Sequence, residues 1–325
     1  MLVITVCLLP LANASLLQVD AGGSIKPDPD YTPVPGKTPE QLNPLLATAR
    51  SLSEVGRLSE AEQSVHQFLK TNSESADAHY LLGFILFRQA RAKDSLTEYT
   101  EGARYRTPNA FDLKVVACDY VLLKDYMDAD KWFTRSVEWD SKDWQGWYYL
   151  GRTKYNENRF EEAVNAFNEC LKLNPTNVKA EDNLGLSYAG LGRNDEAKAA
   201  YLKAMTWEKN GYEKDPGPFV DLGGLLIEDN QVKEAIPYLL EAAQLGPQDI
   251  RVHRGLGKAY LRLNQTQDAE RELNKAIALA PQDASLHYML GQVYRKQGLS
   301  DKANVEFAQY AAMSKADASR ATPAR

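Results

Sequence analysis

The chain has 325 residues, of which 44% are hydrophobic and 25% are charged, so it can bury a substantial apolar core. Its formal net charge of -6 disfavours a general nucleic-acid-binding protein, because such domains are usually basic. A chain of this length would ordinarily suggest two domains, but its internal periodicity favours a single array.

Residues 1–14 have the features of a signal peptide. Leu2–Leu11 is almost wholly apolar, and residues 12–14, Ala-Asn-Ala, have the small-x-small form of a cleavage site. The apolar run is too short to span a bilayer, and no Lys or Arg precedes it. We therefore predict cleavage before Ser15 and export to the periplasm or out of the cell, with no integral membrane span.

Residues 15–41 are typical of a spacer rather than a domain. Prolines recur at short intervals among Asp, Thr and Gly residues, at Pro27, Pro29, Pro33, Pro35 and Pro39. This composition favours an extended, solvated chain. The pattern leaves open whether the spacer holds the following array away from another surface or is a disordered tail.

From residue 42 to about residue 315, three kinds of marker share a period of 34 residues, broken once by a gap of 38 between Ala197 and Ala235. Large side chains recur at Tyr99, Phe133, Phe167, Tyr201, Leu239, Leu273 and Phe307. Small residues recur at Ala61, Ser95, Ala129, Ala163, Ala197, Ala235, Ala269 and Ala303. Leu-Gly pairs end at Gly83, Gly151, Gly185, Gly223, Gly257 and Gly291. A period in this range indicates an array of small units, each unable to bury its own apolar face.

The block Trp144–Asn177 shows what one unit is. Apolar and small residues recur every three or four positions both before and after a polar break at residues 156–159. This spacing is typical of two helices, one on each side of the break. Pro175 then ends the second run. Each unit is therefore predicted to be helix, short turn, helix, in which Gly151 and Ala163 let two backbones approach closely beside Phe167.

This pattern resembles the tetratricopeptide repeat (TPR), with units starting at residues 42, 76, 110, 144, 178, 216, 250 and 284. The first and third units fit least well, because Thr48-Ala49 and Val116-Ala117 stand where Leu-Gly is expected. The resemblance implies an all-α fold, a right-handed superhelical solenoid of about eight helix-turn-helix units over residues 42–315. Residues 316–325 are predicted to be a flexible tail.

The excess of four residues falls between Met205 and Phe219. A tolerated loop insertion is the simpler interpretation. The alternatives are that the longer link bends the array or that it exposes Trp207 and Tyr212 as an extra contact point.

Nothing in the sequence indicates catalysis, a cofactor or a metal site. It contains no phosphate-binding Gly-rich motif, no paired metal-binding histidines and no nucleophile elbow. His79, His253 and His287 all occupy position 4 of their units, where they are predicted to be structural. Cys118 and Cys170 are expected to be packed thiols, and the sequence leaves open whether they pair.

The resemblance places function on the concave inner face, formed by positions 2, 5, 9, 12 and 13 of the first helix of each unit. In the N-terminal half, the predicted partner-binding residues are Tyr80, Phe84, Phe87, Arg88, Tyr148, Arg152 and Tyr155. In the C-terminal half, they are Arg251, Arg254, Lys258, Arg262, Arg295 and Lys296. The alternatives are that Phe84 and Phe87 belong to the core and that the cations form a solvated face.

An aromatic stretch followed by a basic one would suit an acidic or apolar-acidic segment of another protein, because Arg pairs with carboxylates bidentately. The sequence therefore favours a non-catalytic scaffold of the cell envelope that binds a partner peptide and no nucleic acid. One alternative is an accessory module of a polysaccharide- or glycan-handling machine. Another, if the N-terminus is not a signal, is a cytoplasmic co-chaperone-like adaptor. The identity of the partner, the pathway and the oligomeric state stay open.

Overall fold

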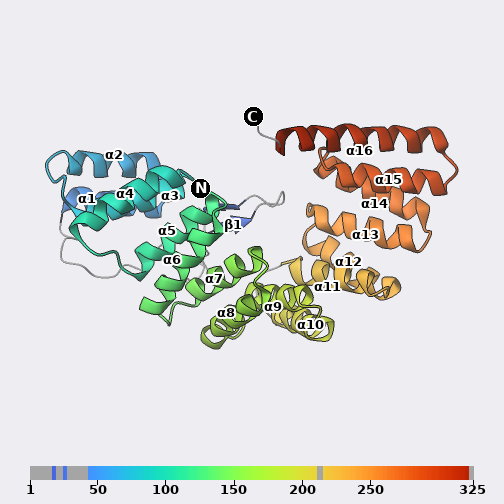
Figure 1. The fold of residues 1–325 in the computed structure, drawn as a ribbon, viewed down its shortest axis with the longest axis horizontal. Helices are drawn as coiled ribbons and strands as arrows, with labels where there is room; N and C mark the ends of the chain where they lie inside the picture. The colour runs from blue at the N-terminus through green and yellow to red at the C-terminus, as the bar shows by residue number, and fades with distance from the viewer. Residues whose placement is uncertain (1–16, 20–24, 28–42, 211–214, 322–325) are drawn as a thin grey trace, which may run out of the picture. The chain divides into compact units, whose positions relative to one another are not determined.

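The computed structural model describes residues 17–19, 25–27, 43–210 and 215–321, and the chain divides into an N-terminal unit, residues 1–173, and a C-terminal unit, residues 174–325. The helices of the N-terminal unit are α1 (Pro44–Glu54), α2 (Leu58–Leu69), α3 (Ala76–Arg88), α4 (Ala92–Tyr105), α5 (Ala110–Leu122), α6 (Tyr126–Trp139), α7 (Trp144–Asn156) and α8 (Phe160–Leu173) (Figure 1). Those of the C-terminal unit are α9 (Val178–Gly190), α10 (Asn194–Asn210), α11 (Gly217–Glu228), α12 (Val232–Leu245), α13 (Ile250–Arg262), α14 (Thr266–Leu279), α15 (Ala284–Lys296) and α16 (Ser300–Ala321) (Figure 1).

The helices form successive antiparallel pairs, each an odd-numbered helix packed against the even-numbered helix that follows it. The second helix of most pairs also contacts the first helix of the next pair, as α4 does with α5 and α12 with α13. The predicted all-α repeat fold is thereby confirmed. Asn and Asp side chains accept hydrogen bonds from the first turn of many first helices, as Asn109 does from the backbone N–H of Asp112 at 2.9 Å.

The two helices of a pair approach closely where the sequence places glycine opposite a large side chain. A Cβ atom added to Gly151 would lie 2.7 Å from the Phe167 ring, and one added to Gly185 would lie 2.6 Å from the Tyr201 ring. Phe167 is completely buried. The predicted role of Gly151 beside Phe167 is thus confirmed. This contact between a glycine and a large side chain recurs with the 34-residue period of the sequence.

The turn inside each pair depends on one residue in the left-handed conformation. At position 15 of all eight units, backbone φ lies between 58° and 77°. Glycine occupies three of these positions and Asn three more, whereas Ala90 and Lys124 occupy the other two. Residues other than Gly and Asn rarely adopt this conformation, so the turns at Ala90 and Lys124 carry local strain.

We expect Lys124→Gly to raise the free energy of unfolding by about 1 kcal/mol, because glycine adopts this conformation without a Cβ penalty. Gly192→Ala, at the same position of another pair, is the reverse control. Its added Cβ would meet nothing within 4 Å, so only the φ of 71° opposes it. The urea midpoint, monitored by circular dichroism, should rise for Lys124→Gly and fall for Gly192→Ala. If both midpoints shifted in the same direction, the turn at Lys124 would not be strained.

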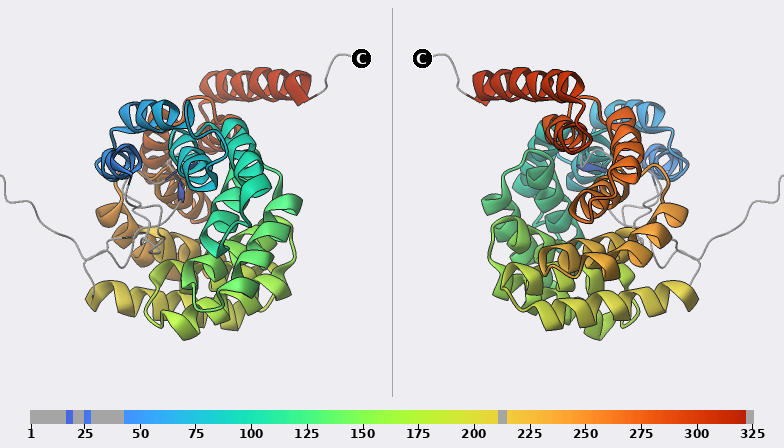
Figure 2. Two further views of the ribbon diagram at one scale, coloured as in Figure 1. Left: turned by 90° about the vertical axis from the view of Figure 1, so that its left-hand side faces the viewer. Right: turned by 90° about the vertical axis from the view of Figure 1, so that its right-hand side faces the viewer.

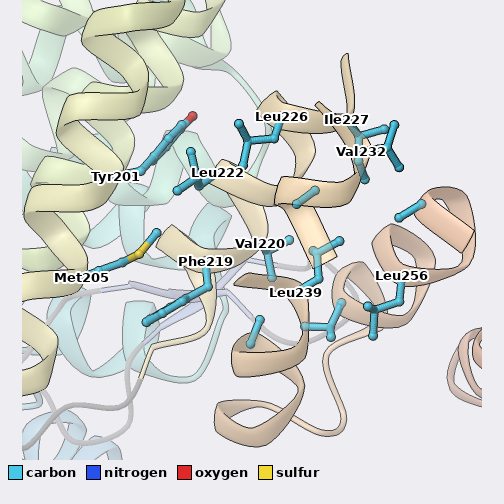
Figure 3. Packing of buried hydrophobic residues seen from close by; sticks show 14 of the residues in the cluster. Tyr201, Met205, Phe219, Val220, Leu222, Leu226, Ile227, Val232, Leu239 and Leu256 are labelled. Atoms are coloured by element: carbon cyan, nitrogen blue, oxygen red, sulfur yellow. The ribbon is translucent and has the colours of Figure 1, made fainter. Parts of the chain in front are cut away.

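The C-terminal unit has a continuous core formed by α10 to α13 (Figure 3). Tyr201 and Met205 of α10 pack with Phe219 and Leu222 of α11, and Leu239 of α12 packs nearby with Leu256 of α13. The four-residue excess lies partly in α10, which has 17 residues, and partly in residues 211–214, which lie outside the described ranges. Of the two residues considered as a contact point, Tyr212 is in that segment.

The structure describes only part of each end of the chain. Residues 1–14, the predicted signal peptide, lie outside the described residues. In the predicted spacer, β1 (Leu17–Val19) pairs antiparallel with β2 (Ile25–Pro27). At the other end, α16 (red in Figure 2) has 22 residues and continues into residues 316–321, which were expected to be flexible. The Ala-rich sequence there has high helix propensity.

Cys118 and Cys170 are free thiols, and both are completely buried. Burial raises the pKa of the Cys118 thiol well above its ordinary value and that of Cys170 to about 12. We therefore expect both thiols to react slowly in the folded protein.

Candidate protein-binding face

The aromatic half of the predicted face is not open to solvent. Five of its seven residues are between 1% and 8% exposed, namely Tyr80, Phe84, Phe87, Arg88 and Tyr148. Phe84 packs against Phe87 and Phe111, with ring centroids 6.4 and 5.6 Å apart. The prediction that these five side chains form an open binding face is wrong, because repeat position fixes the direction in which a residue faces but not what packs on it. For Phe84 and Phe87, the alternative that they belong to the core is confirmed.

The other two residues of that half are partly exposed. Arg152 lies over the Tyr148 ring, with its guanidinium carbon 5.8 Å from the ring centroid. Tyr155 packs against Phe160 at 5.4 Å between centroids. Both keep some surface that a ligand could contact.

The basic half is more accessible. Arg251, Arg262, Arg295 and Lys296 are exposed, and Arg254 and Lys258 are partly exposed. All six lie on the first helices α13 and α15. The sequence therefore located an accessible basic surface in this unit.

Cations at position 13 also bond to the preceding pair. Arg88 donates to the carbonyl oxygen of Ser53 at 2.6 Å, and Lys296 donates to that of Leu261 at 3.1 Å. Arg262 donates likewise to the carbonyl of Ile227. Each acceptor belongs to the last turn of the previous first helix, where carbonyls lack helical partners. These three cations thus link neighbouring repeats, a role that sequence analysis missed.

Three of the four remaining cations of the basic half have carboxylate neighbours, whereas Arg295 lies over the Phe307 ring. Arg251 Nη2 lies 2.7 Å from Asp249 Oδ2, while Arg254 pairs with Asp283 and Lys258 with Glu228. The hydrogen bond from Lys258 lowers the pKa of Glu228 below its ordinary value. Because the Lys258 and Glu228 side chains are 40% and 61% exposed, their pairing is worth about 0–1 kcal/mol and exchanges readily.

Beside Arg251 lies a carboxyl pair that sequence analysis also missed. Asp182 of α9 and Asp221 of α11 share a hydrogen bond, and Asp215 is close to both. Burial, reinforced by the Asp221 and Asp215 carboxylates, raises the pKa of Asp182 well above its ordinary value. Burial raises the pKa of Asp221 to about 6, although Arg251 and Asp182 oppose the rise.

The three histidines at position 4 have one arrangement in common. His253 Nδ1 lies 2.8 Å from Glu272 Oε2, and Nε2 lies 3.1 Å from the Pro247 carbonyl oxygen. His79 and His287 make the corresponding contacts with Glu98 and Glu306 at 2.7 Å. All three rings are buried, so they hold the two helices of a pair together, as the sequence predicted.

Four family models, each described as a tetratricopeptide repeat, match residues 46–111, 144–177, 182–210 and 226–293. The matches fall on the helical pairs whose turns and glycine contacts recur with the period. The chain is a tetratricopeptide-repeat protein. Arrays of this kind present extended surfaces to other proteins, so the fold is that of a protein-interaction scaffold.

Curated relatives share the repeats but are longer. This TPR chain is 26% identical over 200 residues to the peroxisomal targeting signal receptor of Komagataella phaffii, covering 58% of this chain and 33% of the receptor. It is also 26% identical over 252 residues to the aspartyl/asparaginyl beta-hydroxylase of Mus musculus, covering 74% of this chain and 30% of the hydroxylase. The chain thus spans about a third of the length of these relatives.

Solved structures share the fold at low identity. A tetratricopeptide repeat protein from Parabacteroides merdae superposes with a TM-score of 0.62 at 17% identity, covering 77% of this TPR chain and 97% of that one. A chain of the APC/C hetero-tetramer Cut9–Hcn1 gives 0.61 at 18% identity, covering 83% and 53%. The type IV pilus biogenesis factor PilW gives 0.57 at 18% identity, covering 62% and 92%.

Within the described ranges, no helix is long and apolar enough to cross a membrane. The same residues contain no group of three His, Cys, Asp or Glu side chains placed to hold a metal ion. TPR arrays are typically non-catalytic scaffolds, and the match to the hydroxylase covers only part of that enzyme.

Proposed function

We propose that this TPR protein is a non-catalytic, exported scaffold of the cell envelope that binds an acidic segment of another protein on the inner face of α13 and α15. The observation that carries the proposal is the set of accessible cations there, Arg251, Arg254, Lys258, Arg262, Arg295 and Lys296. Tyr288, also on the inner face of α15, is 43% exposed and supplies an apolar anchor beside them. An apolar-acidic segment fits both features.

The existing carboxylate neighbours do not block such binding. Glu228 pairs with Lys258 and lies 3.6 Å from Arg262, but its side chain is 61% exposed. A ligand carboxylate can take its place at little cost, because exposed ion pairs contribute about 0–1 kcal/mol. The rest of the surface is held by packed helices, so little ordering entropy is lost on the scaffold side.

Export rests on the sequence of residues 1–14, whose apolar run and Ala-Asn-Ala site have the form of a signal peptide. Cleavage before Ser15 would remove that segment and leave every described residue in the mature protein. The scaffold would then meet its partner outside the cytoplasm.

A peptide-binding experiment tests the binding surface. Peptides are selected from a random display library on the full chain, and their affinities are measured by fluorescence anisotropy. For acidic peptides, we expect Lys258→Gln with Arg295→Gln to raise Kd about tenfold, which is the loss of roughly 1.4 kcal/mol of charge-assisted bonding. Higher salt should weaken binding further.

The control is Arg271→Gln with Lys275→Gln on the second helix α14. These two cations are exposed on the other helix of the pair and contact the Glu272 carboxylate, so the net charge changes by the same amount. The Kd of this control variant for the same acidic peptides should stay within about twofold of the wild-type value. Equal losses in both variants, or binding that does not respond to salt, would count against the basic inner face.

A further inference from the structure

The last described helix pair, α15 and α16, leaves open a face that is buried in every preceding pair. Positions 24 and 27 of the repeat, both on the second helix, show the difference. At position 24, the residues of the preceding units, from Val65 to Leu273, are all buried, whereas Phe307 is partly exposed. At position 27, those from Phe68 to Ala276 are all buried, whereas Tyr310 is 38% exposed.

The difference arises because this face ordinarily packs against the next pair. In most preceding pairs the second helix contacts the first helix of the following pair, as α12 does with α13 and α14 with α15. No helix follows α16 in the part of the chain that the structure describes (Figure 1). Phe307 and Tyr310 therefore keep an apolar surface that a neighbouring helix takes up elsewhere.

The exposed rings form one cluster, which we call the aromatic end patch and define as Tyr288, Phe307 and Tyr310. The ring of Tyr288, on α15, lies 5.2 Å from that of Tyr310 and 5.8 Å from that of Phe307 between centroids. The Arg295 guanidinium carbon lies 5.7 Å from the Phe307 centroid. Arg295 thus joins the aromatic end patch directly to the basic surface of α13 and α15.

Arg295 differs from its neighbours in having no carboxylate partner among the described residues. Arg254 and Lys258, by contrast, pair with Asp283 and Glu228. A ligand carboxylate can therefore bind the exposed Arg295 guanidinium without displacing an existing one. An apolar side chain beside that carboxylate would cover the open rings, and such contacts between apolar groups and aromatic rings stabilise interfaces.

We propose that the aromatic end patch and Arg295 bind a single partner segment, whose apolar side chain seats on Tyr288 and Tyr310 while its carboxylate pairs with Arg295. The binding surface then continues from the inner face of α15 onto the second helix α16. This inference rests on the proposed function, because the segment is the apolar-acidic one proposed there. The contacts from Arg295 to Tyr310 measure 5.7, 5.8 and 5.2 Å, so an extended segment of about five residues spans them.

The test uses peptides selected from a random display library on the full chain, with Kd measured by fluorescence anisotropy. We expect selected peptides to carry an apolar residue within about five residues of Asp or Glu. Tyr310→Ala should raise their Kd about tenfold, which corresponds to roughly 1.4 kcal/mol. The fold accommodates this change, because alanine is the residue at position 27 of three other units, at Ala204, Ala242 and Ala276.

Val305→Ala is the matched control on the same helix. Val305 is also exposed, but it lies five residues before Tyr310 and so faces away from the patch, since successive helical residues are about 100° apart. Its Kd should stay within about twofold of the wild-type value. Replacing the apolar residue of the peptide by serine should weaken binding to the wild-type chain and have little further effect on Tyr310→Ala, because both changes remove one contact.

The outcomes separate this inference from the proposed function. If Lys258→Gln with Arg295→Gln weakens binding while Tyr310→Ala does not, the aromatic end patch is not part of the site, and the proposed function stands. Peptides that require Tyr310 but no carboxylate would instead contradict the proposed function and the role of Arg295. A wild-type dimer that Tyr310→Ala dissociates, as measured by light scattering, would assign the face to a second copy and overturn the proposal.

Discussion

Gly223→Ala should lower the free energy of unfolding by about 1–3 kcal/mol, whereas Gly224→Ala, one residue further along α11, should raise it by about 0.5–1 kcal/mol. A Cβ added to Gly223 would lie 2.7 Å from Cγ and Cδ2 of Leu239. Leu239 is completely buried in the core of the C-terminal unit, where dense packing restricts its movement. The methyl group therefore forces α11 and α12 apart, which is overpacking of a dense core.

Gly224 is the matched control because it shares the helix, the neighbours and the loss of backbone freedom, but not the contact. Its added Cβ meets nothing within 4 Å, so only the gain in helix propensity from glycine to alanine remains. Urea unfolding of both variants, followed by far-UV circular dichroism, measures the two effects on one scale. If Gly223→Ala were as stable as Gly224→Ala, the helices would not be in the close contact that the period implies.

Much of the fold follows from the sequence because its main determinants repeat. Gly151 and Phe167 could be recognised as a contact since the same pair of residue types recurs one period away. The first helices begin at the predicted residues in six pairs, and one and two residues later at Gly217 and Pro44. A repeated contact appears in a single sequence as a repeated residue type.

What the sequence did not reveal depends on which groups meet in space. Arg262 and Lys296 appeared as ligand-binding cations, but each also bonds a carbonyl 35 residues earlier. Residue type at position 13 varies too much among units for that bond to show as a pattern. Phe84 was predicted to bind a partner, yet it is buried against Phe87 of its own helix and Phe111 of α5. Neither fact can be read from periodicity.

The Asp182–Asp221 pair should make the C-terminal unit less stable as pH rises. A carboxyl whose folded pKa is raised binds more protons in the folded than in the unfolded state between the two pKa values. The free energy of unfolding therefore falls as pH increases through that window. For Asp221, the window runs from about 3.9, the ordinary Asp value, to about 6. For Asp182 it extends higher, because burial and the neighbouring carboxylates raise its pKa further.

Asp182→Asn removes one carboxyl and keeps the side-chain shape, so the remaining Asp221 no longer shares its site with a second acid. The variant should equal the wild type near pH 4 and exceed its stability by on the order of 2 kcal/mol near pH 8. Asp215, Asp249 and Arg251 also face the pair and are present in both proteins, so their contributions cancel in the difference.

Asp195→Asn is the control, because Asp195 is an exposed carboxylate in the first turn of α10. It should cost a few tenths of a kcal/mol, through loss of its interaction with the helix dipole. Urea midpoints measured from pH 4 to pH 8 give the comparison. A stability difference between Asp182→Asn and the wild type that stays constant with pH would mean that the two carboxyls do not share a proton. Asp182 Oδ1 is buried without a hydrogen-bond partner among the described residues, which a charged carboxylate would tolerate poorly. A stability difference that grows with pH would therefore establish that the Asp182–Asp221 pair is neutral in acid and gains negative charge only at higher pH. In acid, the surface would then be neutral at this pair and cationic at Arg251.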